Sequence, residues 1–281
     1  NNKDLAYNLL FNIINYFFMV FISILTIKII TTNIPPEEFG KFAFVLAVVS
    51  ICAITTFSGF NKTVTGYIAK GFHGTIKKTT SISAKTGLLG VLALAVCGFY
   101  YRFEESKEIE SILFFVASIF FIPYTVLNNY TAILKGQEKF KEMMYFNVLL
   151  KTLVFVSLFL VVIVFNKGIL FYGAFQIIIT SIILIVFYSF CLKKLKNNRV
   201  DKSFFKHSAL ISLTGLTGHI IAPIVQLVVN NSFGAGMLAI YVIADRIPSQ
   251  LSGIIKPLLH PISIRLAKNN SISYAVFCLK K

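Results

Sequence analysis

Residues 169–190 read ILFYGAFQIIITSIILIVFYSF, a run of 22 residues without a charged side chain. A transmembrane helix needs about 20 mostly apolar residues to cross the hydrocarbon core of a bilayer, so this run predicts one. Seven further windows qualify: Leu9–Ile30, Phe42–Phe60, Ser81–Tyr100, Ile112–Leu134, Met144–Phe165, Leu210–Val229 and Met237–Leu259. Together with Ile169–Phe190 they predict an all-α fold, a polytopic transmembrane helix bundle with eight spans.

The composition of the 281-residue chain supports this class. Hydrophobic residues make up 56% and charged residues 14%, whereas soluble domains carry about 25% charged residues. Disordered chains are poor in apolar residues, and the strands of a transmembrane barrel alternate rather than run continuously apolar. The four cysteines show no paired spacing, so we expect neither a metal site nor a cofactor.

The net charge of +16 is best explained by membrane topology. Nucleic-acid binding is excluded, because the basic residues form short clusters between apolar runs and not a patch on a soluble domain. Cytoplasmic loops are enriched in Lys and Arg. With the N-terminus inside, 18 of the 27 basic residues fall in cytoplasmic segments and four in outer loops. This predicts both termini inside, and the basic loop 191–207 is expected to contact anionic lipids.

An internal repeat is visible without gaps at an offset of 199 residues. Residues 29–42 read IITTNIPPEEFGKF and residues 228–241 read VVNNSFGAGMLAIY. Two β-branched residues, three small polar residues, an apolar residue and a turn recur in step. The offset spans six helices, an even number, which predicts a parallel repeat. We therefore divide the chain into a first six-helix bundle (1–190), a basic linker (191–207), two helices of a second bundle (208–262) and a cytoplasmic tail (263–281).

Four stretches resemble one transporter family. They are the Asn-rich start of the first window (Asn8, Asn12, Asn15), residues 36–42 (PEEFGKF), residues 134–141 (LKGQEKFK), and residues 233–244 (FGAGMLAIYVIA) with Pro257 and Pro261 following. In these stretches the chain resembles the O-antigen and polysaccharide flippases (Wzx type), within the superfamily that includes the multidrug and toxin extrusion transporters. Members have twelve to fourteen helices, so we expect this chain to be a fragment or a truncated product.

The resemblance implies translocation of undecaprenyl-pyrophosphate-linked oligosaccharide repeat units (O-antigen or capsule) across the bacterial inner membrane. It also implies alternating access, proton coupling, polysaccharide assembly proteins as partners, and no enzymatic activity. Three alternatives stay open: a cation or drug antiporter of the same superfamily, a membrane-embedded glycan polymerase or transferase, and an inactive truncated product. The windows contain five basic residues and one acid, which favours an anionic substrate. The short outer loops leave little room for a polymerase site.

Polar residues inside the apolar windows are the candidate site residues, because polar groups in hydrocarbon are costly and usually face the bundle interior. Asn12 and Asn15 lie near one stripe of the first window, and Asn147 precedes Lys151 by one turn. They could line a cavity for sugar hydroxyls and pyrophosphate, or the asparagines could join helices by hydrogen bonds. Lys85 is one turn into its window, where its ammonium could instead reach the membrane boundary, as could that of Lys151.

The last two windows hold the remaining candidates. Asp245 and Lys256 share a helix face, with Arg246 beside it, and the two cations could bind an anionic head group. Asp245 is the one acid in any window, so it could couple proton movement to transport, or it could simply pair with Arg246. His219 is a second proton-coupling candidate, because a histidine side chain can titrate near neutral pH; packing in the helix is the alternative role.

Overall fold

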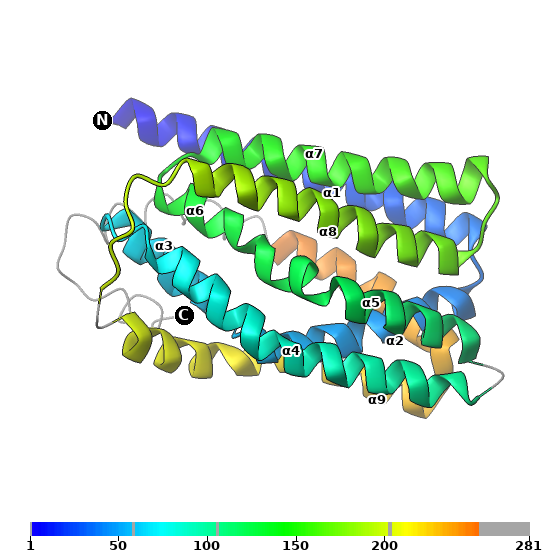
Figure 1. Cartoon of the computed structure of the whole chain (residues 1–281). Coiled ribbons are helices and arrows are strands. Elements are labelled where there is room, and N and C mark those ends of the chain that lie inside the picture. Colours follow the sequence, from blue (N-terminus) through cyan, green and yellow to red (C-terminus); the bar gives the residue numbers. More distant parts are fainter. Residues whose placement is uncertain (1, 58–59, 105–106, 202–203, 253–281) are drawn as a thin grey trace.

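The computed structural model describes residues 2–57, 60–104, 107–201 and 204–252, and every regular element in this part of the chain is helical (Figure 1). The predicted all-α class is therefore confirmed. The α-helices are α1 (Asn2–Asn33), α2 (Pro36–Cys52), α3 (Phe60–Ala69), α4 (Thr75–Arg102), α5 (Glu108–Val126), α6 (Tyr130–Gly136), α7 (Phe140–Leu158), α8 (Ile169–Lys193) and α9 (Phe204–Ser252). Two short 3-10 segments, η1 (Ala53–Thr56) and η3 (Leu127–Asn129), and a π-helical segment, η4 (Phe159–Val164), complete the list.

Seven stretches in the described part are long and apolar enough to cross a membrane. The seventh, Ile220–Arg246, contains Gly234, whose φ of 83° and ψ of 172° interrupt α9. Glycine adopts this conformation readily because it has no Cβ. Figure 1 shows the chain turning back there, so α9 has a first arm (residues 204–233) and a second arm (residues 235–252). These arms correspond to the predicted windows Leu210–Val229 and Met237–Leu259, of which residues 253–259 lie outside the described chain.

The segment 61–80, which the predicted windows Phe42–Phe60 and Ser81–Tyr100 leave as a loop between two spans, is largely helical. Helix α3 occupies Phe60–Ala69, and α4 already begins at Thr75. Helix α3 and the first turns of α4 (residues 75–80) contain several Thr and Lys residues. A search for apolar windows therefore does not detect them, although they are helical. The predicted window Ile112–Leu134 is also not one continuous helix, because η3 separates α5 from α6.

The two ends of the bundle differ in charge. We call "basic end" the end that holds α3, the α6–α7 turn and residues 194–201 of the linker, and "acidic end" the end that holds the α1–α2, α4–α5 and α7–α8 connections and the turn within α9 (Figure 1). At the acidic end, α2 begins with Pro36, Glu37 and Glu38. Proline fits the first helical turn, and acids there interact favourably with the helix dipole. The placement of the basic end in the cytoplasm stays a prediction.

Two buried apolar clusters hold the helices together, one near each end. The acidic-end cluster includes Ile30, Phe39, Phe42, Leu113, Phe121 and Tyr172. The basic-end cluster includes Ile76, Tyr130, Phe140, Phe187 and Phe204. Many large apolar side chains point outward instead, among them Leu89 (65% exposed) and Ile119 (72% exposed). Such an apolar exterior suits a bundle surrounded by lipid, where helices satisfy their own backbone groups.

The linker is fastened to the turn between α3 and α4. The Asn197 side chain accepts a hydrogen bond from the backbone N–H of His73 (3.3 Å) and donates one to the carbonyl of Gly71 (3.0 Å). The backbone N–H of Gly74 donates to the carbonyl of Arg199 (2.9 Å). We call this set of contacts the Asn197 clasp. It holds the linker against the first predicted bundle.

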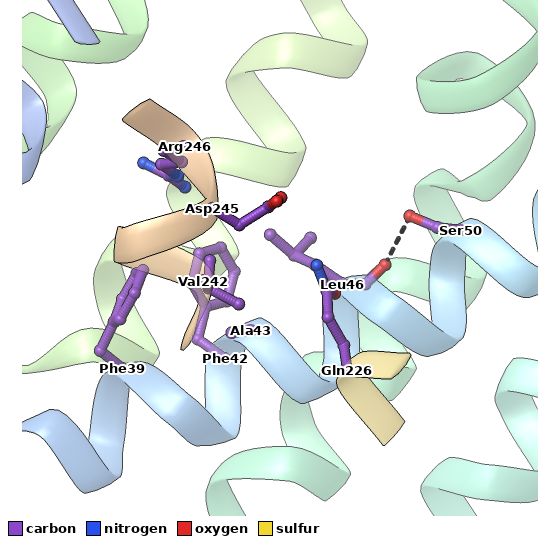
Figure 2. A pocket seen from close by; sticks show the side chains of 9 residues that line it. All are labelled: Phe39, Phe42, Ala43, Leu46, Ser50, Gln226, Val242, Asp245 and Arg246. Atoms are coloured by element: carbon purple, nitrogen blue, oxygen red, sulfur yellow. Dashed lines mark hydrogen bonds between the residues drawn. The ribbon is translucent and has the colours of Figure 1, made fainter. Parts of the chain in front are cut away.

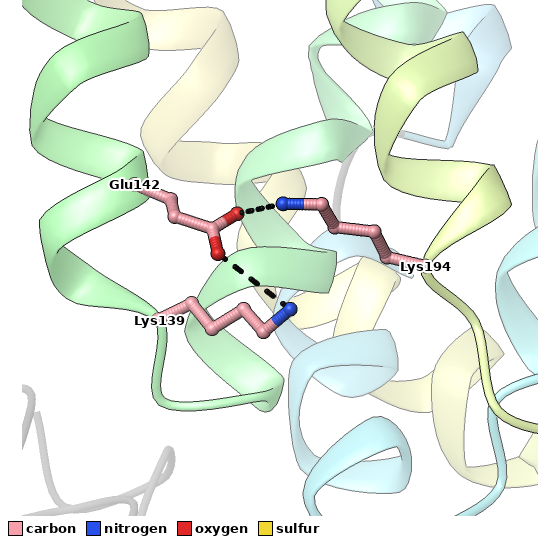
Figure 3. Close-up of polar contacts among 3 residues, drawn as sticks. All are labelled: Lys139, Glu142 and Lys194. Carbon is pink, nitrogen blue, oxygen red and sulfur yellow. Dashed lines mark hydrogen bonds and ion pairs between the residues drawn. The ribbon is translucent and has the colours of Figure 1, made fainter.

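A carboxylate at the same end joins α7, α8 and the α6–α7 turn (Figure 3). The Glu142 side chain lies 2.8 Å from the Lys194 ammonium and 3.6 Å from the Lys139 ammonium. All three side chains are about one-third exposed. The pairs therefore orient the helix ends more than they stabilise the fold, because exposed ion pairs contribute about 0–1 kcal/mol.

Candidate functional site

Helix α2 and the second arm of α9 make a very close contact at the acidic end. A Cβ atom built on Gly40 would lie only 1.8 Å from the backbone oxygen of Ala235. A Cβ built on Gly236 would lie 3.7 Å from Cγ of Glu37, an ordinary van der Waals distance. The contact therefore joins the two segments of the sequence repeat, and it depends on the absence of a side chain at Gly40.

A pocket of about 240 Å³ lies next to this contact, between α2 and the two arms of α9 (Figure 2). Its walls are apolar on the α2 side, with Ser50 as the polar exception, and polar groups enter from α9. The lining residues are Phe39, Phe42, Ala43, Leu46, Ser50, Gln226, Val242, Asp245 and Arg246. Two of the predicted site residues, Asp245 and Arg246, thus lie at one pocket.

Asp245 and Arg246 point in different directions from the second arm (Figure 2). The Arg246 guanidinium lies 5.9 Å from the centre of the Phe39 ring, a distance at which a cation is attracted to an aromatic face. The Asp245 side chain is exposed and lines the same pocket. This divergence leaves the carboxylate and the guanidinium to act on different groups.

A second cation from another helix lies near Arg246. The Lys151 ammonium on α7 is close enough for its charge and that of Arg246 to repel each other. Tyr172 on α8 also lies within electrostatic range of Arg246, and its ring packs edge-on against Phe42 with the ring centres 5.8 Å apart. Like charges brought together in a region of low dielectric are stabilised by an anion that binds between them. The arrangement can therefore hold an anionic group.

The two predicted asparagines that the structure describes lie in helix contacts. The Asn147 side-chain oxygen accepts a hydrogen bond of 2.9 Å from the hydroxyl of the buried Tyr130. The Asn15 side-chain oxygen is buried without a hydrogen-bond partner in the described part, on α1, which packs along α7. Asn147 therefore serves at least as an anchor between α6 and α7.

The other predicted site residues do not join this pocket in the described structure. Lys85 is exposed on α4, which contributes no lining residue. Asn12 lies on α1 and His219 on the first arm of α9, but their side chains lie outside the described residues, as does all of Lys256.

Three polar residues at the site were not among the predicted ones. Gln226 and Ser50 line the pocket, and Tyr172 stands beside Arg246. Gln226 interrupts an apolar window, so the cost of a polar group in hydrocarbon could have identified it. Tyr172 gives no such signal, because the chain contains 12 tyrosines and only the fold separates this one from the rest.

Comparisons with known proteins agree on one type of membrane protein. The family model described as "Polysaccharide biosynthesis protein" matches residues 3–264. A solved structure of a MOP superfamily transporter from Pyrococcus furiosus, described as having a binding pocket of reverse polarity that suggests a different function, is 16% identical with a TM-score of 0.64. This match covers 99% of the present chain and 68% of that one.

A second solved structure, a proline-to-alanine mutant of a MATE protein, is 15% identical with a TM-score of 0.56, and the match covers 99% of this chain and 69% of that one. The search of curated proteins found no match. At these identities the two solved structures show a shared fold. The resemblance noted in the sequence is therefore confirmed, because the family model matches nearly the whole chain and the two transporter structures share its fold.

Proposed function

Because the chain belongs to the polysaccharide biosynthesis protein family, we propose that it moves undecaprenyl-pyrophosphate-linked oligosaccharide repeat units across the bacterial inner membrane. It is a multi-pass membrane protein with the fold of MOP superfamily transporters. In the proposed cycle, the part that contains α1–α8 and the part that contains α9 alternate between two arrangements, with access first from one side of the membrane and then from the other.

One observation carries the proposal of an anionic substrate. Lys151 belongs to the first predicted bundle and Arg246 to the second, and their charges repel each other across the joint between them. A pyrophosphate placed between the two cations would attract both, which draws the two parts together. Guanidinium groups bind phosphate oxygens in a fork-like geometry, and the neighbouring Tyr172 hydroxyl supplies a further hydrogen-bonding group.

The contact between Gly40 and Ala235 closes the pocket toward the acidic end in this arrangement. It brings two backbones together at the acidic end, so a substrate in this arrangement would enter from the basic end. Release at the acidic end would require α2 and the second arm of α9 to separate. With the predicted orientation, this is the direction of export.

The test replaces each cation with a neutral side chain of similar size. Lys151→Gln and Arg246→Gln are expressed in a strain that lacks the native transporter, and surface polysaccharide is measured at matched protein levels. We expect each variant to display less surface polysaccharide than the parent, because the loss of about 1.4 kcal/mol of binding free energy lowers the affinity for substrate roughly tenfold. Lys85→Gln is the matched control, because Lys85 is a lysine within a predicted span, on α4, and its charge, unlike that of Lys151, is not coupled to Arg246. Normal surface display by both the Lys151 and the Arg246 variant would remove these cations from the mechanism.

Proton coupling is the second part of the proposal, and Asp245 is its proposed carrier because its carboxylate lines the pocket. In proteoliposomes with an imposed pH gradient, Asp245→Asn should leave substrate binding intact and abolish the gradient dependence of translocation. Gradient-driven transport by Asp245→Asn would assign the coupling elsewhere. Export of a cationic drug in the same assay would instead favour the drug antiporter.

A further inference from the structure

A second cavity, remote from the α2–α9 pocket in sequence and composition, lies between α7 and α8 near the acidic end. Its volume is about 430 Å³, and its walls come from α7, the π-helical segment η4, the turn that follows, and α8. Leu160 and Phe175 are typical of its lining and are 42% and 50% exposed. The groove is therefore open to the side of the bundle and faces the surrounding membrane.

The lining of the groove offers almost no hydrogen-bonding groups to an occupant. Ser157 is one of its two polar lining residues, and its hydroxyl already donates a hydrogen bond of 2.7 Å to the carbonyl of Val154 on the same helix. The other walls are aliphatic or aromatic. An occupant of this part of the groove must be a hydrocarbon chain, because a polar group would lose its hydrogen bonds with water and gain none.

One cation stands in the groove lining, in the turn at the acidic end. Lys167 is exposed, and its ammonium lies 5.5 Å from the centre of the Phe171 ring. None of the ion pairs between described residues includes Lys167. A hydrocarbon groove with a single cation in the turn at its end complements a molecule that has a long apolar tail and one anionic head.

We propose that this groove is a binding site for an anionic phospholipid of the leaflet at the acidic end, with an acyl chain along α7 and α8 and the phosphate beside Lys167. The site differs from the basic linker, which we expect to attract anionic lipids by charge alone. Here the tail and the head are both recognised. The inference does not depend on the transport cycle, because it concerns equilibrium binding to one arrangement of α7 and α8.

The absence of tryptophan from the sequence allows a direct test. Phe175→Trp places one fluorophore in the groove, and the protein is reconstituted in phosphatidylcholine vesicles that contain a small fraction of brominated lipid, which quenches a tryptophan in contact with it. We expect brominated phosphatidylglycerol to quench with about fivefold higher relative affinity than brominated phosphatidylcholine, the preference that about 1 kcal/mol for one cation near the surface produces. Lys167→Gln in the same background should remove the preference, and Lys167→Arg should keep it.

The matched control is Phe99→Trp, a lipid-facing position on α4 (61% exposed) near Arg102, whose guanidinium lies 3.9 Å from Glu108. Its quenching should follow the bulk lipid composition. Equal quenching by both lipids at the groove, or a preference that survives Lys167→Gln, would overturn the assignment. Displacement of the phospholipid by a trace of polyprenyl phosphate would overturn it as well, because the groove would then hold the tail of the transported lipid.

Discussion

Glu37 and Gly236 occupy equivalent positions of the sequence repeat, 199 residues apart, and they are also neighbours in space: a Cβ built on Gly236 would lie 3.7 Å from Cγ of Glu37. In a two-fold arrangement, only residues close to the axis contact their own equivalents. The turn between α1 and α2 therefore meets the turn at Gly234, where an axis relating the two segments of the repeat would pass. The parallel repeat itself stays a prediction.

Gly40→Ala should weaken the closed contact at the acidic end. The new methyl group would meet the Ala235 oxygen at 1.8 Å, and overpacking of this kind costs about 1–3 kcal/mol. The readout uses a Ser50→Cys reporter in the pocket, in a chain whose own cysteines are replaced by serine. Labelling by a membrane-impermeant maleimide added at the acidic side should increase in Gly40→Ala.

Gly236→Ala is the control for this experiment, because its Cβ meets Glu37 at an ordinary distance. It should label like the parent. Equal labelling of all three proteins would show that the Gly40 contact does not govern access to the pocket.

Tyr130→Phe should lower the stability of the basic-end cluster. The variant deletes the hydroxyl that donates to Asn147, and a buried hydrogen bond of this kind contributes about 0.5–1.5 kcal/mol. Thermal unfolding in detergent measures the loss. Tyr145→Phe, at a site that is 54% exposed, should unfold at the parental temperature. Identical midpoints for the two variants would mean that Asn147 finds another donor.

The Asn197 clasp should loosen in acid. Burial, and secondarily the charge of Lys196, lowers the pKa of His73 below its ordinary value of 6.5. The released form binds a proton more tightly than the clasped form, so the clasp has its full stability above pH 6.5 and loses it as the pH falls below that value. Hydrogen exchange at the Gly74 amide, which donates to Arg199, reports the opening after correction for the intrinsic pH dependence.

The reference for this measurement is the Lys139 amide, which donates to Leu134 at 2.8 Å in the α6–α7 turn of the same end. Its protection should not change over the same pH range. In His73→Gln the Gly74 amide should also lose its acid sensitivity. Persistent sensitivity in that variant would assign the effect to another group.

Glu142→Gln should have a small effect that depends on salt. The variant removes both ion pairs of Figure 3, and partly exposed pairs contribute about 0–1 kcal/mol each. The melting temperature should fall slightly in dilute buffer, and the difference from the parent should vanish at high ionic strength because salt screens exposed charges. A difference that is independent of salt would point to packing instead of charge.

The sequence alone predicts the membrane spans and places the two charged pocket residues, Asp245 and Arg246, in the last of them. Long apolar runs such as Ile169–Phe190 become helices because lipid offers the backbone no other hydrogen-bond partners. The same criterion passes over α3, which is too polar and too short to cross a bilayer. Arg246 was predicted from its cost in hydrocarbon, but its approach to Tyr172 depends on how α8 and the second arm pack. Distances between helices that lie far apart in sequence leave no periodic signal.

The Asn197 clasp also limits how far the two parts can travel. It holds Arg199 to the first part, and α9 begins at Phe204, whose buried ring packs against Phe60 and Tyr67 of α3. The chain between Arg199 and Phe204 can reach at most roughly 17 Å, since an extended chain spans about 3.3–3.6 Å per residue. While the clasp is intact, the start of α9 must therefore stay within this distance of Arg199. A large movement of α9 relative to the first part must then be a rotation about the basic end. The displacement would be largest at the Gly234 turn.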